Sequence, residues 1–290
     1  MTDTDPPSPQ NTIAFQGVPG AYSHLACREA YPGMTPLPCP TFEAAFEAVE
    51  NGRAVLAMIP IENSVAGRVA EIHMILPHTA LIIRGEHFHR VNHQLLGVKG
   101  ATVEGLREVH SHVQALSQCH KFLRRHDLGA RAHADTAGAA AEIAERGDPA
   151  IGAIASALSA EIYGLDMLAS DIEDADHNTT RFLILGTEAV EIPPGTEHVL
   201  TSFVFRVRNV PAALYKAMGG FATNGVNMTK LESYMLDGGF TSTMFYADIE
   251  GDPRARNVQL ALEELNFYSA EVKVLGTYPA NPFRYQGRGR

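Results

Sequence analysis

Cysteine is scarce in this chain of 290 residues, which has only Cys27, Cys39 and Cys119, none of them at C-x-x-C spacing. An odd number of cysteines at such spacings argues against a disulfide framework and favours a reducing compartment. No apolar run approaches the roughly 18 residues of a membrane span. The N-terminal stretch MTDTDPPSPQ lacks the basic start and apolar run of a secretory signal. We therefore expect a cytoplasmic protein without a membrane partner.

Positive charge is also in short supply, since 23 Lys and Arg residues face 33 Asp and Glu residues, giving a formal net charge of −10. Nucleic-acid partners favour a basic face, so the composition argues against nucleic acid. The 13 histidines invite a metal hypothesis. The chain nevertheless contains no H-E-x-x-H motif and no Cys/His set at zinc spacing, so the sequence predicts no metal site.

The first part of the chain alternates short apolar runs with amphipathic stretches, from Ile13 to about Gly186. The pattern predicts strands at 13–15, 54–61, 81–83, 95–98, 151–154 and 181–185. It predicts helices at 21–30, 42–51, 113–125, 136–146 and 155–163. Such alternation is typical of α/β units built around mainly parallel sheets.

The order of elements changes after a stretch that contains Pro193, Pro194 and Gly195 and is typical of a linker. Beyond it the pattern predicts strands at 200–207, 226–236, 240–249 and 270–275, with helices at 211–223 and 253–265. The segment Asp237-Gly238-Gly239 is a hairpin signal between the two middle strands. This β-α-β-β-α-β order is ferredoxin-like, which by itself fixes no function.

Five polar clusters follow or begin predicted elements of the first part. They are GVPGAYS at 17–23, IPIENSVAG at 59–67, SHVQALSQC at 111–119, DTA at 135–137 and NTTRF at 178–182. Each has a plain structural reading, such as a tight turn for the first or a helix cap by Asn63, Ser64 or Ser111. Together they stand on separate α/β units, whose strand ends can face one ligand cleft.

The order of these clusters, followed by the ferredoxin-like segment, resembles that of prephenate dehydratases with a C-terminal ACT regulatory domain. The resemblance runs from about Ile13 to Tyr278. It implies a two-lobed catalytic region, built like a periplasmic binding protein, at 12–188, a linker at 189–198 and an ACT domain at 199–279. A disordered N-terminus at 1–11 and a flexible tail at 280–290 complete the predicted organisation.

The implied reaction is that of a carbon–oxygen lyase, in which prephenate loses carbon dioxide and its ring hydroxyl to give phenylpyruvate for L-phenylalanine biosynthesis. Aromatisation of the ring supplies the driving force, so the resemblance implies no cofactor. It implies that Thr180 protonates, or donates a hydrogen bond to, the departing hydroxyl. The implied substrate-binding residues are Asn63, Ser64, Ser111, Gln118, Thr136 and Arg181. Arg181 has two open roles: it pairs with substrate, or it braces the lobe through an acidic partner.

The resemblance also implies that the ACT domain binds L-phenylalanine as an inhibitor and mediates assembly into a homodimer or homotetramer. The implied effector residues are Pro211, Ala212, Ala213, Leu214, Glu232 and Ser233. Two motifs depart from the family. The usual Pro-Gly-Ala-Leu has Ala212 at its second position, and the usual Glu-Ser-Arg-Pro ends in Tyr234-Met235. These departures leave the affinity for phenylalanine open.

Two alternatives remain at this point. Arogenate differs from prephenate by an amino group in place of the side-chain ketone, and one sequence does not separate the two substrates. A non-catalytic amino-acid sensor would combine the same two-lobed binding region with the ACT domain.

Overall fold

The computed structural model describes residues 8–235 and 243–286. Its first sheet has the strand order β2-β1-β3-β11-β5, with β4 paired to β3. The strands are β1 (Thr12–Gln16), β2 (Thr35–Cys39), β3 (Leu56–Asn63), β4 (Gly67–Arg68), β5 (Ile82–Arg90) and β11 (Thr179–Gly186). Strand β1 runs parallel to β2 and β3. Its side chains from Ile13 to Phe15 are fully buried, as expected for a strand covered on both faces.

The helices that follow these strands are α1 (Tyr22–Ala30), α2 (Phe42–Glu50) and α3 (Ala70–Ile75). A short 3₁₀ turn at Pro9–Asn11 precedes β1. Helix α2 begins at a Thr41 cap, whose hydroxyl accepts the Ala44 N–H. No helix among the described residues is long and apolar enough to cross a bilayer.

The second sheet has the order β10-β6-β9-β7-β8. Its strands are β6 (Gln94–Gly97), β7 (Glu108–His112), β8 (Gly129–His133), β9 (Ile151–Ala155) and β10 (Asp166–Ala169). Strand β7 is parallel to β8 and β9, whereas β6 and β10 are antiparallel to their neighbours. The sheet is therefore mixed rather than mainly parallel.

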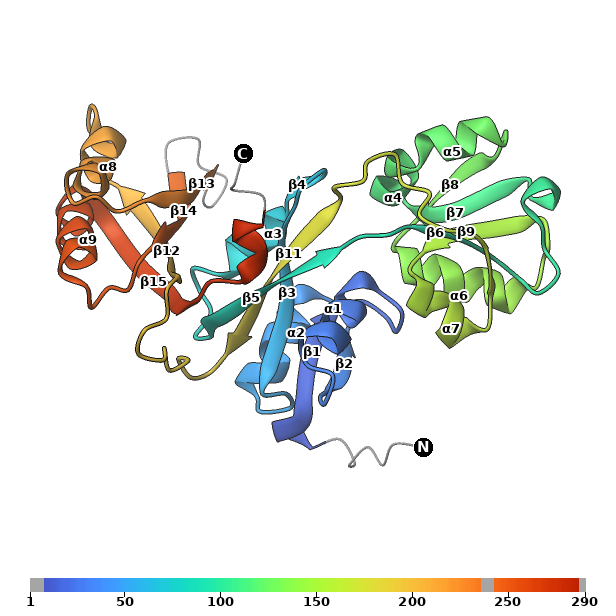
Figure 1. The fold of residues 1–290 in the computed structure, drawn as a ribbon, viewed down its shortest axis with the longest axis horizontal. Coiled ribbons are helices and arrows are strands. Elements are labelled where there is room, and N and C mark those ends of the chain that lie inside the picture. Colours follow the sequence, from blue (N-terminus) through green and yellow to red (C-terminus); the bar gives the residue numbers. More distant parts are fainter. Residues whose placement is uncertain (1–7, 236–242, 287–290) are drawn as a thin grey trace. The chain divides into compact units, whose positions relative to one another are not determined.

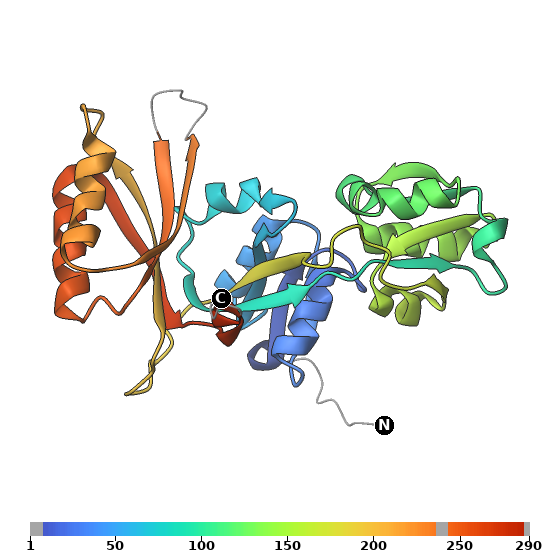
Figure 2. The same ribbon diagram turned by 45° about the horizontal axis from the view of Figure 1, so that its top comes forward.

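Helices cover both faces of this second sheet (Figures 1 and 2). One face packs against α4 (Val113–Gln118) and α5 (His120–Arg125), after a 3₁₀ turn at Val103–Gly105. The other face packs against α6 (Thr136–Arg146) and α7 (Ala157–Tyr163). The prediction of a single helix at 113–125 is wrong, since the helix is interrupted at Cys119, where φ is −114° and ψ is 19°. The Cys119 side chain is fully buried at this break.

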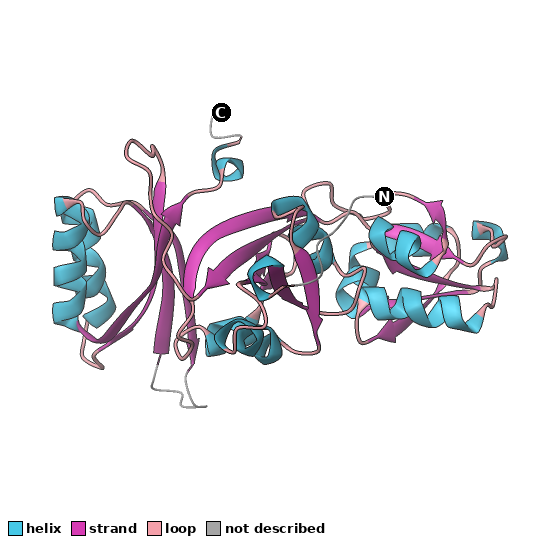
Figure 3. Cartoon of the chain, turned by 90° about the horizontal axis from the view of Figure 1, so that it is seen from below, coloured by secondary structure: helices cyan, strands magenta, loops and turns pink. Residues whose placement is uncertain are grey.

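The C-terminal sheet is antiparallel, with the order β13-β14-β12-β15. Its strands are β12 (Val199–Val207), β13 (Met228–Met235), β14 (Thr243–Glu250) and β15 (Ser269–Pro279). Helices α8 (Ala213–Thr223) and α9 (Arg256–Tyr268) lie side by side on one face (Figure 3). The predicted fold class, two α/β lobes followed by a ferredoxin-like α+β sheet, is confirmed. The hairpin predicted at Asp237-Gly238-Gly239 lies outside the described residues.

The chain divides into two compact units in a way that its sequence order does not suggest. One unit holds the chain up to Val69 together with His87–Phe182, and the other holds Ala70–Glu86 together with the chain from Leu183. In the second unit, the Lys273 ammonium on β15 donates to the carbonyl oxygens of Pro77 at 2.9 Å and Thr79 at 2.7 Å. The segment before β5 is thus held by the C-terminal sheet.

Candidate functional site

The amide of Asn63 lies at the centre of a polar site between β3 and the start of β11. Its Nδ2 donates to the Thr180 hydroxyl oxygen at 2.9 Å and to Asn178 Oδ1 at 2.8 Å. Its Oδ1 accepts the backbone N–H groups of Val65 at 2.9 Å and Ala66 at 2.8 Å. Because a backbone N–H can only donate, these two contacts fix which way the Asn63 amide is turned.

The Thr180 hydroxyl is left as a donor by this arrangement. Its oxygen already accepts from Asn63 Nδ2, so its single proton is not directed at Asn63. Thr180 is half-buried, which leaves part of its surface accessible. A positioned hydroxyl donor of this kind can assist the departure of a leaving oxygen.

Three amides join the first lobe to the second. Asn178, which is buried, donates from Nδ2 to Gln118 Oε1 at 2.9 Å. Gln118 is the last residue of α4, so the contact links the NTTRF segment to the second sheet's helices. The structure therefore brings together three of the predicted site residues, Asn63, Gln118 and Thr180. Asn178 stands beside them in the NTTRF motif, where the sequence assigned it no role.

Two further residues extend this network and were not assigned from sequence. His93 Nε2 lies 2.8 Å from Gln118 Oε1, and the Tyr22 hydroxyl lies 2.7 Å from His93 Nδ1. Burial lowers the pKa of His93 below its ordinary value, although the Gln118 contact and the Glu173 carboxylate raise it. Burial, with Cys119 and Glu173 nearby, raises the pKa of Tyr22 well above its ordinary value. Both groups are therefore neutral near pH 7.

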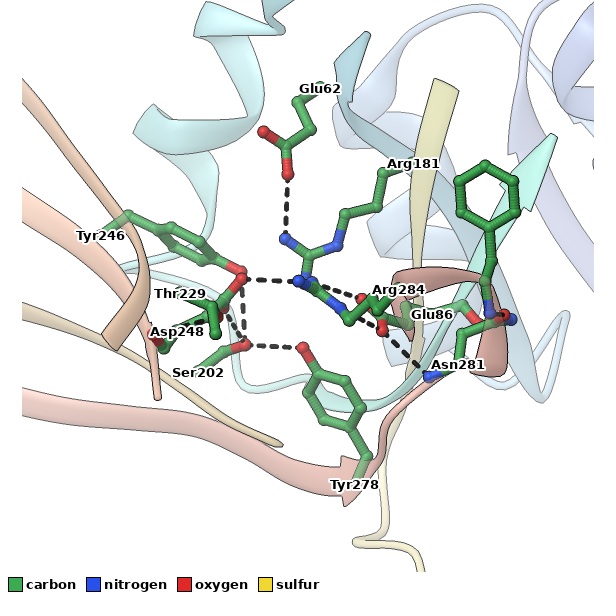
Figure 4. Close-up of polar contacts among 11 residues, drawn as sticks. Glu62, Glu86, Arg181, Ser202, Thr229, Tyr246, Asp248, Tyr278, Asn281 and Arg284 are labelled. Carbon is green, nitrogen blue, oxygen red and sulfur yellow. Dashed lines mark hydrogen bonds and ion pairs between the residues drawn. The ribbon is translucent and has the colours of Figure 1, made fainter. Parts of the chain in front are cut away.

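Ser64 and Arg181 make contacts within the protein. The Ser64 hydroxyl donates to the His177 carbonyl at 2.7 Å and accepts the Thr179 N–H at 2.9 Å. The Arg181 guanidinium, 3% exposed, lies 3.1 Å from Glu62 Oε1 (Figure 4). Of the two roles left open for Arg181, this ion pair supports bracing of the lobe.

Ser111 and Thr136 lie in the second lobe, outside the hydrogen bonds just described. Ser111 is fully buried on β7, and its hydroxyl donates to the Ile154 carbonyl at 2.6 Å. Thr136 is the first residue of α6 and is half-buried. Helix α6 is capped by its neighbour Asp135, whose Oδ1 accepts the Gly138 N–H at 2.6 Å.

Glu29, His87 and His89 are the three residues whose ligand atoms could together hold a metal ion in the described part of the chain, since these atoms lie within 4.8 Å of one another. Glu29 Oε2 lies 3.0 Å from His87 Nε2 and 2.8 Å from His89 Nδ1. Burial raises the pKa of Glu29, but the two histidine contacts outweigh it and the net shift is downward. The sequence does not reveal this cluster, because Glu29 comes from α1 and the histidines from β5.

A cavity of about 310 Å³ opens at the start of α8 in the C-terminal unit. Ala212, Ala213 and Leu214, from the predicted effector motif, line it together with Tyr215 and Phe245. Pro211, Glu232 and Ser233 are not among its lining residues. Ala212 has φ 61° and ψ 19°, the left-handed conformation that favours glycine.

A second hollow, of about 560 Å³, lies along the segment before Asn178. Its lining includes the carboxylates of Asp171, Glu173, Asp174 and Asp176, with Arg90 and His177 beside them. Four carboxylates against so few cations make this hollow unfavourable for a dianionic ligand.

Comparison with known proteins identifies the family. A family model for prephenate dehydratase matches residues 13–190. A Komagataeibacter europaeus protein named bifunctional N-acyl-homoserine lactone acylase/prephenate dehydratase is 51% identical over 275 residues, covering 95% of this chain and 98% of its own. The chloroplastic arogenate dehydratase/prephenate dehydratase 2 of Arabidopsis thaliana is 41% identical over 279 residues, covering 93% of this chain and 73% of its own.

Among solved structures, a prephenate dehydratase from Arthrobacter aurescens in complex with L-Phe superposes with a TM-score of 0.84 at 28% identity, covering 94% of this chain and 91% of its own. The match of the family model to more than half of the sequence and the similarity of full-length relatives agree with the motifs that surround Asn63 and Thr180. The chain belongs to the prephenate dehydratase family.

Proposed function

We propose that the protein converts prephenate to phenylpyruvate without a cofactor. The electron pair of the bond to the ring carboxylate moves into the ring as carbon dioxide leaves. Hydroxide is expelled from the opposite ring carbon, and the ring becomes aromatic. Thr180 donates its hydrogen bond or proton to the departing oxygen. The observation that carries this proposal is the fixed amide of Asn63, which occupies the Thr180 oxygen and leaves the hydroxyl proton for substrate.

Substrate binding falls to the neighbouring amides in this proposal. Gln118 Oε1 accepts two hydrogen bonds, so its Nε2 donors are left to bind a substrate carboxylate. A weak acid such as threonine acts mainly through position, and the rigid hydrogen bonds around it supply that position. Arogenate is the alternative substrate, because the name of the Arabidopsis thaliana relative includes both arogenate dehydratase and prephenate dehydratase.

We further propose that residues 199–279 form an ACT domain that binds L-phenylalanine and that the enzyme is a cytoplasmic homodimer or homotetramer. The cavity beside Ala212 to Leu214 supports this, since it lies at the predicted effector motif. Its volume of about 310 Å³ is at the lower end of ordinary small-ligand pockets. The solved structure of the Arthrobacter aurescens relative, which is in complex with L-Phe, also supports an amino-acid ligand.

The test is a turnover assay on purified protein with prephenate, following phenylpyruvate absorbance in alkali, with and without phenylalanine. We expect Thr180→Ala to lower kcat by roughly 10²–10⁴-fold while KM changes little. Thr179→Val, one residue away, is the matched control and should keep near-normal turnover. A parallel assay with arogenate decides the substrate. A Thr180→Ala variant as active as the parent enzyme would remove Thr180 from the mechanism.

A second candidate activity is hydrolysis of N-acyl-homoserine lactones. It rests on one observation, the 51% identical relative whose name pairs this acylase with prephenate dehydratase. Incubation with a long-chain N-acyl-homoserine lactone, with the released fatty acid measured, tests it directly. Release by the parent enzyme above that of a heat-inactivated sample would establish the second activity, and no release would exclude it for that lactone.

A further inference from the structure

The hydrogen bonds from Asn63 to Tyr22 form one continuous chain, and its direction is set at one end by the backbone. The N–H groups of Val65 and Ala66 hold Asn63 Oδ1, so Asn63 Nδ2 must face Asn178. Asn178 therefore presents Oδ1 to Asn63 and Nδ2 to Gln118. The orientation of each amide therefore fixes the orientation of the next one along the chain of hydrogen bonds.

The residues of the second lobe are constrained in the same way. Gln118 must present Oε1 to Asn178, and that oxygen also lies 2.8 Å from His93 Nε2. A carbonyl oxygen can only accept, so His93 Nε2 must carry a proton. The His93 ring is 2% exposed and neutral near pH 7, so its Nδ1 is left as an acceptor.

Tyr22 supplies the donor that this nitrogen needs. Its hydroxyl lies 2.7 Å from His93 Nδ1 and 3.1 Å from the Asn92 carbonyl oxygen. We assign its single proton to His93 Nδ1, because this nitrogen is the closer acceptor and is bare in the tautomer derived above. The rings meet edge to face, with centroids 5.5 Å apart. The raised pKa of Tyr22 keeps the phenol protonated. The backbone N–H of His93 donates to Glu173 Oε2 at 2.9 Å, which helps to hold the main chain that carries the imidazole ring.

We propose that His93, held in one tautomer by Tyr22, is a positioning residue for the reaction at Thr180. Its Nε2–H, together with Asn178 Nδ2, holds Gln118 Oε1, so that both side-chain N–H donors of Gln118 are left for the substrate carboxylate. At the other end of the chain, the backbone-held Asn63 keeps the Thr180 hydroxyl as a donor. Neither His93 nor Tyr22 touches the reacting atoms. The role rests on the proposed dehydratase function, whereas the direction of the chain rests on the contacts alone.

The first experiment compares His93→Leu with His93→Gln. Leucine fills similar space without a donor, so Gln118 Oε1 loses one of the two donors that hold it. We expect kcat/KM for prephenate to fall roughly 10–100-fold, as for one buried partner left unsatisfied. Glutamine places an N–H donor near the position of His93 Nε2 and should recover most of the loss. His110→Leu removes an equally buried histidine that contacts Glu108 and should leave turnover near normal.

The second experiment reads the tautomer without turnover. In protein labelled with ¹⁵N-histidine, the His93 signals are those that disappear in His93→Gln. At pH 7 we expect a protonated Nε2 and a bare Nδ1, and Tyr22→Phe should shift the balance toward the other tautomer. A protonated Nδ1 with a bare Nε2 would overturn the chain direction.

The outcomes separate this inference from the proposed function. If the parent enzyme does not turn over prephenate, the proposed function fails, and the tautomer still tests the chain direction. If the parent enzyme is active but His93→Leu keeps normal kcat/KM, or His93→Gln is no better than His93→Leu, His93 has no positioning role.

Discussion

At the scale of single residues, the site depends on which atom of each amide faces which neighbour. Asn63 illustrates this, because its oxygen is held by two backbone N–H groups and its nitrogen by Asn178 and Thr180. An aspartate at position 63 would still accept the two backbone N–H groups. In its contacts with Asn178 and Thr180, however, it could only accept a hydrogen bond and not donate one. The role of Thr180 as a donor can therefore be tested without changing Thr180.

We expect Asn63→Asp to lower kcat by roughly 10²–10³-fold while the protein stays folded. A carboxylate cannot donate to Thr180, so the Thr180 hydroxyl would turn its proton toward Asp and away from substrate. Partial recovery should appear as the pH falls and the new carboxyl becomes protonated. The measurement is kcat for prephenate across pH, with Asn266→Asp in α9 as the control for added charge. Normal turnover in Asn63→Asp would mean that Asn63 does not direct the Thr180 proton.

At the scale of elements, a helix was predicted best where the sequence has a start signal before it and a stop signal after it. Helix α6 was predicted at 136–146 and lies there, with an Asp135 cap before it and Gly147 at φ 68° after it. Strand β2 was missed because TPLPC contains Pro36 and Pro38, which argue against a strand. It lies at the edge of its sheet, where proline is tolerated.

The site shows the same limit of local signals. Asn63, Gln118 and Thr180 stood in motifs and were predicted, although nothing local showed that they touch. The partnership of Tyr22 with His93 joins residues 71 positions apart and became visible only in the fold. Strand β8 was missed for a related reason, since most of its residues are exposed and carry no apolar alternation.

The start of α8 gives a prediction at this scale. Ala212 has φ 61°, a left-handed conformation that costs an L-residue about 1–2 kcal/mol. We expect Ala212→Gly to raise the free energy of unfolding by about 1 kcal/mol and to enlarge the neighbouring cavity. Ala222→Gly, in the last turn of the same helix, should lower it instead. Denaturant unfolding of both variants checks the signs, and a destabilised Ala212→Gly would contradict the reasoning.

At the scale of the whole molecule, the 3₁₀ turn near the C-terminus is anchored to its unit by ion pairs with buried carboxylates. Arg284, in the 3₁₀ turn Pro282–Tyr285, lies 2.6 Å from Glu86 Oε1 and 3.5 Å from Asp248 Oδ2 (Figure 4). Both carboxylates are fully buried, on β5 and β14. Asn281 adds an N–H to Glu86 at 3.1 Å. These contacts fall within the segment 280–290 that the sequence predicts to be a flexible tail, and they join it to two distant strands.

Arg284 is therefore expected to matter far more for stability than its place near the end of the chain suggests. Arg284→Leu would leave Glu86 and Asp248 buried without this cation, and losing one partner of a buried ion pair costs about 3–5 kcal/mol. Thermal and denaturant unfolding of the full chain measure the loss. Arg254→Leu is the matched control, because Arg254 is 77% exposed beside Asp252 and its removal should leave the midpoint almost unchanged. Equal midpoints for the two variants would show that the C-terminal turn contributes nothing to the stability of its unit. A large loss confined to Arg284→Leu would instead make the turn Pro282–Tyr285 part of the connection between β5 and the antiparallel sheet.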